Sequence, residues 1–412
     1  MISVAEASER TLARASALPG ETVATANAAG RFLAEDAIAR LTSPPYDNAS
    51  MDGYALRRVD LSVGATFTVV DSIAAGSSPS RELAPGEAAR VMTGAPVPTG
   101  ADSVIRHEYT DNGRTIVTIA DTRDAGRNIR RMGEDFSVGD ILFRAGEELG
   151  IAHIGALAAS GLKSARVHRR PRVAMITSGD ELVELNDFQP SMSGSRIISS
   201  NSVTLAAAII DAGGDPVDAG IARDDPESLR EKIESVRDAD LIITTAGMSV
   251  GDHDHVRDVF SSLGATLDFW KVRMRPGAPL AYGELAGVPW IGMSGNPVSA
   301  LVSFELFVRP VIRRMLGSHR IFRETVSVAL GEPITIAASL MHFLRAVITR
   351  VEGNVGEARL AGSQSSGVLT AMARSNALLI LPGDRLELAA GEIHRALPLG
   401  PSFATSDSMR LT

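Results

Sequence analysis

The 412-residue chain contains no cysteine. Disulfide bonds, zinc–thiolate centres, iron–sulfur clusters and thiol nucleophiles are therefore excluded. Aromatic residues are also scarce, at 4% of the chain, whereas glycine occurs 38 times. A shortage of aromatic side chains argues against base-stacking surfaces for single-stranded nucleic acid. The abundant glycines indicate many turns and binding sites lined by backbone atoms.

Excess positive charge and long apolar runs are lacking as well. The formal net charge is −8, so a general attraction to nucleic acid or to an acidic membrane is not expected. No apolar run approaches the length needed to span a bilayer. The N-terminal segment has no continuous apolar core of the signal-peptide type. We therefore expect a cytoplasmic protein with no nucleic-acid or membrane partner.

The pattern of apolar segments divides the chain into four regions. Alternating strand-like and helix-like segments over 171–318 predict a three-layer α/β domain with a mainly parallel sheet. Short β-type runs predict a small β domain over 44–139 and a C-terminal, barrel-like β domain over 319–412. Residues 1–43, which we predict to be helical, and 140–170 form a discontinuous linking domain. The predicted fold class is multi-domain α/β plus β, with the small β domain inserted near the N-terminus.

Two local predictions concern the α/β region. Residues 189–200 (QPSMSGSRIISS) are polar and rich in serine, which predicts a flexible loop. A long apolar helix is predicted from residue 297, and we expect Pro310 to kink it.

The segment PPYDNASMDGYALR (44–57) carries two carboxylates on a tightly shaped loop. The prolines at its start favour extended backbone, and Gly53 suits a tight turn. Asp47 and Asp52 are therefore expected on a loop that aims side chains at a ligand. The alternative, which composition alone favours, is a turn whose aspartates cap the backbone.

Three predicted strands of the α/β region end in polar loops that contain glycine, at 177–181, 245–254 and 294–297. Ligands bind beyond the carboxyl ends of the strands in an open parallel sheet. The third loop consists of Ser294, Gly295, Asn296 and Pro297. Its last two residues suit the start of a helix, whose free N–H groups and positive dipole end attract phosphate or another oxyanion.

Carboxylates near the same edge suggest a magnesium site. Glu181, Asp252 and Asp254 would supply hard oxygen ligands beside a bound phosphate. A single glycine turn with an aspartate is more often structural, but three such loops at one edge converge in space. The run from Asp252 to His255 could instead suggest a transition-metal site. We disfavour that reading because alternate residues of an extended loop point apart and His255 is expected to begin a helix.

Seven motifs occur in an order typical of one protein family. They are MDGYALR (51–57), MTGAPVPTGAD (92–102), RRMGEDFSVGD (130–140), TSGDEL (177–182), SVGDHD (249–254), RPGAPLAYGEL (275–285) and SGNPVSA (294–300). Together they resemble the molybdopterin molybdenumtransferases, whose eukaryotic relatives include the E domain of gephyrin. A later segment, 365–383, is similar to the final domain of the same family, so the resemblance covers essentially the whole chain.

The resemblance implies a reaction and a set of partners. Adenylylated molybdopterin is bound, its phosphoanhydride is cleaved with help from Mg²⁺, and molybdate is inserted as the second substrate, which releases AMP. An elongated homodimer is implied, with the cleft shared between the MDGYA-bearing domain of one subunit and the α/β and C-terminal domains of the other. Transient contact with the adenylyltransferase and with apo-molybdoenzymes is implied too.

The resemblance also assigns roles to individual residues. Nucleotide and metal binding are assigned to Ser178, Asp180, Glu181, Gly247, Ser249 and Asp254. Asp52 and Asp135 would face the cleft from the partner, and Arg275 would contact molybdate or phosphate oxygens, for which guanidinium is suited. Arg345, with Ser365 or Ser366, would line the pterin end.

The chain departs from the family pattern in two places. Ala278 stands where the family usually has lysine in Pro-Gly-Lys-Pro, and Ala246 replaces the first glycine of a Gly-Gly pair. Loss of a lysine beside an anionic substrate removes a positive charge that can matter in a transition state. Two alternatives therefore stay open. One is molybdopterin adenylylation, although SVGDHD differs from the nucleotide loop typical of that enzyme; the other is a non-catalytic scaffold.

Overall fold

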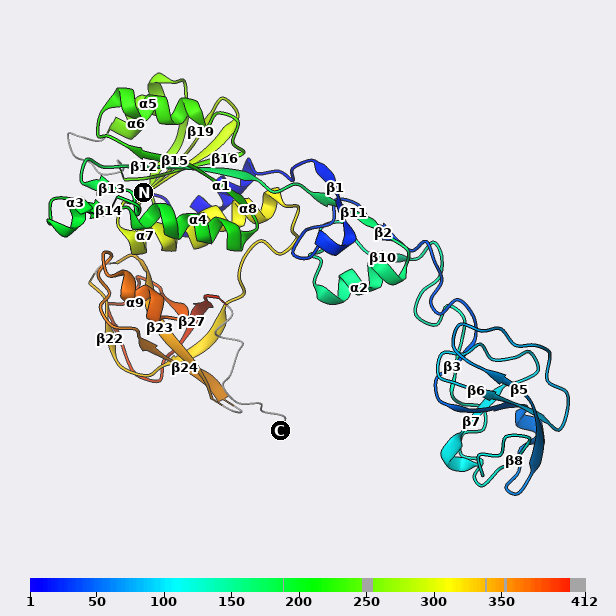
Figure 1. The fold of residues 1–412 in the computed structure, drawn as a ribbon. Coiled ribbons are helices and arrows are strands. Elements are labelled where there is room, and N and C mark those ends of the chain that lie inside the picture. Colours follow the sequence, from blue (N-terminus) through cyan, green and yellow to red (C-terminus); the bar gives the residue numbers. More distant parts are fainter. Residues whose placement is uncertain (188, 247–254, 338, 352–353, 401–412) are drawn as a thin grey trace.

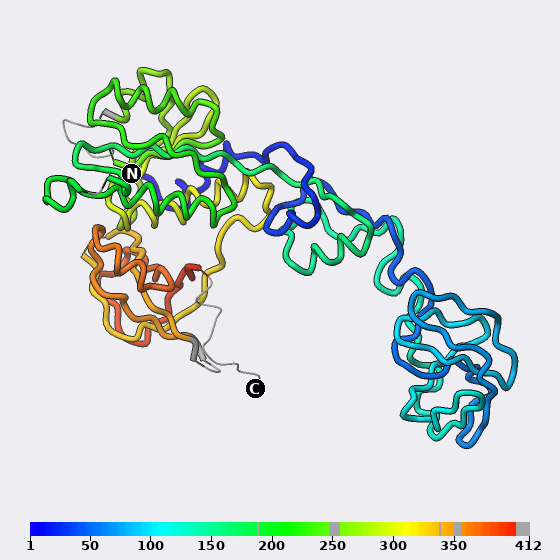
Figure 2. The backbone as a smooth tube through the Cα atoms, viewed as in Figure 1, coloured from blue at the N-terminus to red at the C-terminus, as the bar shows by residue number. Residues whose placement is uncertain are grey.

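The computed structural model describes residues 1–187, 189–246, 255–337, 339–351 and 354–400. An α/β unit and a C-terminal β unit lie together at one end of an elongated molecule (Figure 1). A small β unit lies at the other end, and a narrow linking module joins the two ends, as the backbone trace also shows (Figure 2). No helix among the described residues is long and apolar enough to cross a bilayer.

The N-terminal helix is much shorter than predicted. Helix α1 (Val4–Ala13) begins at Ser3, whose hydroxyl accepts a hydrogen bond from the Glu6 amide at 3.1 Å. The chain then forms strand β1 (Gly20–Ala24), the 3₁₀ turn Thr25–Asn27 and strand β2 (Ala37–Ile38). The prediction of helix throughout 1–43 is therefore wrong after residue 13, because β1 and β2 pair with strands that lie more than 100 residues later.

The linking module is built from those two strands and their partners. Strand β11 (Ser164–His168) pairs antiparallel with β1, and β10 (Ile141–Phe143) pairs antiparallel with β2. Helix α2 (Ile151–Ala159) packs against them through Leu157, in a small core that also contains Leu33 and Val167. Both crossings between the two ends of the molecule pass through this module (Figure 1).

The small β unit has two separate sheets. The first has five strands in the order β7–β4–β6–β5–β8, and β3 pairs with β9 in the second. These strands are β3 (Asn48–Ala49), β4 (Gly53–Leu56), β5 (Thr66–Ile73), β6 (Glu87–Val91), β7 (Ser103–Arg106), β8 (Ile116–Thr118) and β9 (Ile129–Arg130). The 3₁₀ turns Arg58–Asp60 and His107–Tyr109 follow β4 and β7.

The α/β unit has a six-stranded sheet in the order β15–β12–β16–β20–β19–β17. The strands are β12 (Arg172–Ser178), β15 (Asp215–Ala222), β16 (Leu241–Thr245), β17 (Thr266–Lys271), β19 (Pro279–Leu285) and β20 (Val288–Met293). The first four in spatial order are parallel, whereas β19 pairs antiparallel with both β20 and β17. The parallel half carries the strand ends at which the candidate site was predicted.

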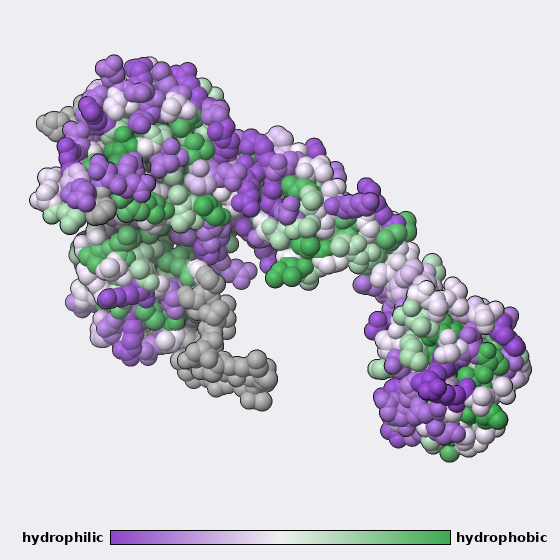
Figure 3. All heavy atoms as spheres, viewed as in Figure 1, coloured by the Kyte–Doolittle hydropathy of each residue, from purple (hydrophilic) through white to green (hydrophobic). Residues whose placement is uncertain are grey.

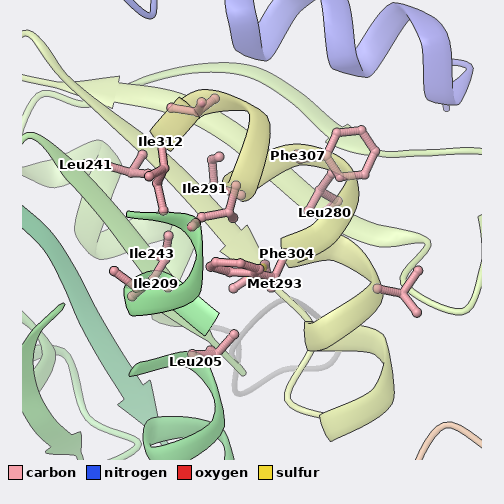
Figure 4. Packing of buried hydrophobic residues seen from close by; sticks show 14 of the residues in the cluster. Leu205, Ile209, Leu241, Ile243, Leu280, Ile291, Met293, Phe304, Phe307 and Ile312 are labelled. Carbon is pink, nitrogen blue, oxygen red and sulfur yellow. The ribbon is translucent and has the colours of Figure 1, made fainter. Parts of the chain in front are cut away.

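Helices cover both faces of this sheet. Helices α1, α4 (Ser200–Ala212), α7 (Pro297–Ser303) and α8 (Arg309–Met315) share one buried cluster with the strands, and α5 (Pro226–Ser235) and α6 (His255–Ser262) share the other. In the first cluster, Ile209 of α4 and Phe304 meet Ile243 and Ile291 of the sheet (Figure 4). The predicted three-layer architecture is confirmed.

One local prediction for this unit is wrong, and the structure adds detail to a second, which concerns Pro310. Residues 189–200 are not an unstructured loop, since they contain helix α3 (Gln189–Met192) and strand β14 (Ile197–Ile198), which pairs with β13 (Leu182–Val183). The helix that contains Pro310 changes to a π-helical turn over Phe304–Val308 between α7 and α8. Proline cannot donate to the carbonyl four residues earlier and its ring crowds that carbonyl, which accounts for the widened turn.

The C-terminal unit is a closed five-stranded barrel, and a sixth strand from the α/β unit pairs with one of its strands. The barrel strands are β21 (Val326–Leu330), β23 (Met341–Val351), β24 (Asn354–Leu360), β25 (Ala377–Leu381) and β27 (Ile393–Pro398), closed by the pairing of β23 with β25. Strands β22 (Ile334–Thr335) and β26 (Glu387–Leu388) pair separately, and helix α9 (Leu369–Arg374) lies beside β23. Strand β18 (Met274–Arg275) leaves the α/β unit and adds to β23.

Strand β4, which carries the MDGYA motif, packs closely against β7 at Gly53. A Cβ atom added there would lie 2.1 Å from the carbonyl oxygen of Ile105 on β7. We expect Gly53→Ala to destabilise the small β unit by about 1–3 kcal/mol, seen as faster hydrogen exchange of the β4 and β7 amides. The control is Gly155→Ala in α2, where nothing lies within 4 Å and helix propensity favours alanine. Equal exchange in both variants would contradict the expected clash.

Candidate active site

A cavity of about 500 Å³ opens at the carboxyl ends of the parallel strands. We call it the strand-end cavity. Six predicted residues line it, together with others from the same edge and from β14 and α4. The lining residues are Thr177, Ser178, Glu181, Leu182, Ile197, Ile198, Ser199, Ser200, Asn201, Thr245, Ala246, Pro279, Ser294, Gly295, Asn296 and Pro297. The predicted convergence of these strand-end loops is therefore observed for the residues that the structure describes.

Glu181 is the one charged side chain among the described residues that line the strand-end cavity. It folds back over Gly179, where an added Cβ would lie 2.7 Å from its Oε2 atom. Its carboxylate has no ion-pair or hydrogen-bond partner among the described residues. Asp180 next to it is exposed and exchanges backbone contacts with Asp224, since each carboxylate accepts from the other residue's amide at 3.3 Å.

The loop that ends β16 is shaped for a small residue. Ala246 has φ of 72°, the left-handed region in which a side chain is strained. Its Cβ would lie 3.1 Å from a Cβ placed on Gly295, which is closer than ordinary van der Waals contact, so the two loops pack tightly here. The side chain of Asn201 donates to the Gly295 carbonyl at 2.8 Å, which ties the start of α4 to the loop before α7.

A second cavity, of about 620 Å³, lies between the α/β unit and the barrel. We call it the interdomain cavity. It is lined by Met274, Arg275, Pro276, Gly277, Ala278, Pro279, Ser294, Asn296, Ser299, Leu340, Gln364, Ser365 and Ser366. Three of these residues, Pro279, Ser294 and Asn296, also line the strand-end cavity, so the two cavities adjoin. The described lining of the interdomain cavity includes no carboxylate, which makes it suitable for an anion.

Arg345 lies behind the serines of the interdomain cavity and is completely buried. Its Nη2 atom donates to the carbonyls of Ser363 and Ser365 at 2.9 and 3.1 Å. Its Nε and Nη1 atoms have no partner among the described residues. Burial lowers the pKa of this guanidinium. A buried cation with no carboxylate partner among the described residues is costly. Arg345 does not itself line the cavity, and its hydrogen bond to the Ser365 carbonyl connects it to the cavity wall.

The remaining predicted residues either lie outside the described part of the chain or do not line these cavities. Gly247, Ser249, Asp252 and Asp254 lie outside the described residues. Among the residues that are described, no three His, Asp or Glu side chains form a metal-binding group. Asp52 and Asp135 belong to the β3–β9 region at the far end of the molecule (Figure 1). One subunit alone therefore does not place them beside the strand-end cavity.

Asp52 holds two loops of the small β unit together. Its Oδ1 atom accepts from the amide and the hydroxyl of Thr93 at 2.6 and 2.7 Å. These hydrogen bonds, the hydroxyl first, lower the pKa of the carboxyl group and keep it ionised. Asp47 similarly accepts from the Met132 amide at 2.8 Å and pairs with Arg131. Both aspartates thus bridge between loops and do not cap their own turn.

Comparison with known proteins covers nearly the whole chain. Three family profiles match in order: MoeA N-terminal region (domain I and II) at residues 2–161, a probable molybdopterin binding domain at 174–314, and MoeA C-terminal region (domain IV) at 327–399. Molybdopterin molybdenumtransferase 2 of Mycobacterium tuberculosis is 39% identical over 383 residues, which cover 90% of this chain and 93% of that protein. The chain belongs to the molybdopterin molybdenumtransferase family. It is a transferase, as the motifs predicted.

Other relatives agree with this membership. The molybdopterin molybdenumtransferase of a Nostoc species is 36% identical over 373 residues, covering 88% of this chain and 85% of that protein. The crystal structure of a molybdopterin biosynthesis moeA protein from Pyrococcus horikoshii OT3 aligns with a TM-score of 0.82 and 27% identity, covering 97% of this chain and 100% of that one. The predicted family and fold class are confirmed.

Several lining residues were missed by the sequence reasoning. Ile197 and Ser199 to Asn201 fall in or just after the segment predicted as a flexible loop, yet the pairing of β14 with β13 returns this segment to the sheet edge. Gln364 reaches its position through mutual hydrogen bonds with the backbone of Arg345, at 2.9 and 3.0 Å. The serine before an apolar helix was a usable signal at 199, whereas no local signal marked Gln364.

Thr93→Val should raise the pKa of Asp52, because it removes a hydroxyl donor. The folded-state pKa lies below the ordinary value of 3.8, so the Asp52 contribution to stability is present above that value and is lost as pH falls through the folded pKa. A carboxyl-carbon NMR titration would measure the change. Asp71, whose pKa is lowered by hydrogen bonds from Ser80, is the internal control and should not move. An unchanged Asp52 titration would refute the assigned cause.

Proposed function

We propose that this transferase inserts molybdate into adenylylated molybdopterin, cleaves the phosphoanhydride and releases AMP. The observation that carries the proposal is the junction of the two cavities at Pro279, Ser294 and Asn296. A single elongated ligand with anionic groups can extend across both. Proteins of this family are named for molybdenum transfer to molybdopterin, and the adenylylated form of the substrate is our inference.

The two cavities suit different parts of this substrate. The strand-end cavity combines apolar walls, such as Leu182 and Ile198, with hydroxyl groups, as a nucleotide requires. The interdomain cavity is lined by Arg275, which forms no ion pair among the described residues. The buried Arg345 lies behind the cavity wall, where it donates to the Ser365 carbonyl. Guanidinium groups suit tetrahedral oxyanions. We therefore place the nucleotide in the former and molybdate with the pterin dithiolene in the latter.

Glu181 is the described residue best suited to hold Mg²⁺. Magnesium commonly binds through one or two carboxylates together with substrate phosphates and water. The carboxylate of Glu181 lines the strand-end cavity and has no partner among the described residues, so it fits this ion. Asp252 and Asp254 remain predicted ligands outside the described residues. When bound, the ion would neutralise charge on the phosphoanhydride during cleavage.

We also propose an elongated homodimer in which Asp52 and Asp135 reach the cleft of the partner subunit. Two features support it. The small β unit lies far from the α/β unit and the barrel of the same subunit, which hold the two cavities (Figure 1). Apolar side chains also gather on the surface of the linking module (Figure 3). Ile38, Ile141 and Ile151 of this module are 49%, 46% and 91% exposed. A second copy of the chain would cover such a surface. The cytoplasmic location stays a prediction.

The direct test mixes purified protein with adenylylated molybdopterin, Mg²⁺ and molybdate. We expect AMP release that depends on molybdate, and active cofactor that restores an apo-molybdoenzyme. Consumption of ATP with free molybdopterin would instead indicate the adenylyltransferase. Absence of any AMP release would indicate a scaffold, and either result would overturn the proposal.

Glu181→Gln should raise the Mg²⁺ concentration needed for half-maximal AMP release by roughly tenfold, because a neutral amide replaces an ionised ligand. Glu184→Gln is the matched control, since Glu184 lies on the same segment but does not line the strand-end cavity. An unchanged magnesium dependence in Glu181→Gln would exclude it as a ligand.

Ala278→Lys should speed molybdate insertion, because it adds a positive charge to the half-buried wall of the interdomain cavity. We expect roughly a tenfold increase in the rate at low molybdate concentration. Ala278→Gln extends the side chain without the charge and should give no gain. An equal or slower rate in Ala278→Lys would contradict the expected gain from a positive charge at this position.

A further inference from the structure

The helix predicted to bind an oxyanion has little capacity left to do so. Helix α7 begins with Pro297, which has no N–H group. The next amide, that of Val298, donates to the Ser366 carbonyl of the barrel at 3.1 Å. The Ala300 amide donates to the Asn296 carbonyl at 2.9 Å. Within the described part of the chain, Ser299 has the one first-turn amide of α7 without an acceptor, so the prediction of several free donors at this helix is wrong.

Helix α4, unlike α7, begins with several amides that donate to no described residue, and it begins at the strand-end cavity. It has 13 residues, and the amides of its first three, Ser200, Asn201 and Ser202, have no acceptor among the described residues. Two of these residues line the strand-end cavity. Free amides and the positive end of the helix dipole make such a terminus a donor set for an oxyanion.

The residue that precedes α4 supplies an independent observation. Ser199 is the N-cap, yet its side chain makes no capping hydrogen bond. It lines the strand-end cavity and is 2% exposed, and its hydroxyl oxygen is buried without a partner in the described chain. Thr245, at the end of β16, has a second buried hydroxyl of this kind on the same cavity. Buried hydroxyl groups are normally hydrogen-bonded, so both indicate a ligand.

We propose that the N-terminus of α4, together with the Ser199 hydroxyl, binds the nucleotide phosphate of the substrate. This proposal rests on the proposed function and deepens it, because it names the phosphate subsite. The Thr245 hydroxyl would form a hydrogen bond with the phosphate from the other wall of the cavity. Glu181 lines the same cavity, where a magnesium ion would bind to both its carboxylate and the phosphate. The main contribution of α7 is then the Ser294–Asn296 loop before it, which shapes the cavity wall. Its amides contribute little.

The test measures binding of AMP and of adenosine by calorimetry, at low salt and without divalent cations. Ser199→Ala should weaken AMP binding about tenfold, as expected for loss of a hydrogen bond to a charged group. Ser199→Asp should weaken it at least about tenfold, because a carboxylate at the N-cap repels phosphate. The same carboxylate should raise the melting temperature, because aspartate caps a helix well. Adenosine, which lacks the phosphate, should bind equally well to all variants.

Thr204→Val is the matched control. Its hydroxyl is already satisfied by the Ser200 carbonyl at 2.7 Å, and it lies one turn along α4 outside the cavity lining. It should bind AMP like the wild type. The proposal is overturned if Ser199→Ala and Ser199→Asp bind AMP with wild-type affinity, or if they lose AMP and adenosine equally. Failure of the proposed function is a separate outcome: the wild type would then release no AMP on addition of molybdate.

Discussion

The pairing of β18 with β23 is the contact on which the rest of the site depends. Only two residues, Met274 and Arg275, leave the α/β unit to join the barrel sheet, opposite Met341 and His342. A hydrogen bond from Val298 to the Ser366 carbonyl joins the same two units a short distance away. Between these two attachments lies the interdomain cavity. Buried contacts of Phe343 and Met372 with the core of the α/β unit reinforce these attachments. Together they fix the position of Arg275 relative to the barrel.

Charge in this acidic chain is arranged locally. The net charge of −8 would repel an anionic substrate at long range, but salt screens such effects beyond about 10 Å. Inside the interdomain cavity the nearest fixed charge dominates, and Arg275 is the one charged side chain among its described lining residues. The Nε and Nη1 donors of Arg345, which have no partner among the described residues, cost folding free energy.

The helices and parallel strands of the α/β unit could be predicted because their apolar periods are long and regular, and strands of one parallel sheet must end at one edge. The failures share a different cause. Strand β1 and strand β14 are short, and each forms only because a distant partner is held nearby by the rest of the fold. The local sequence does not indicate such a partner, so we predicted residues 14–43 as helix and residues 189–200 as a loop. The lining residues from β14 and α4 were missed for the same reason.

The contrast between α7 and α4 shows why a helix start that matches a motif is a weak predictor of binding. Asn296 and Pro297 form a good helix start by sequence, but the donors that follow are available only if no other carbonyl reaches them. The barrel places Ser366 there, and that contact is set by tertiary structure. Ser199 is an equally good N-cap by sequence, but its side chain does not cap α4, and its hydroxyl has no partner within the described part of the chain. An uncapped terminus beside a cavity is stable only when solvent or a ligand completes it, so the binding end of a helix is identified by donors that remain unpaired in the folded chain.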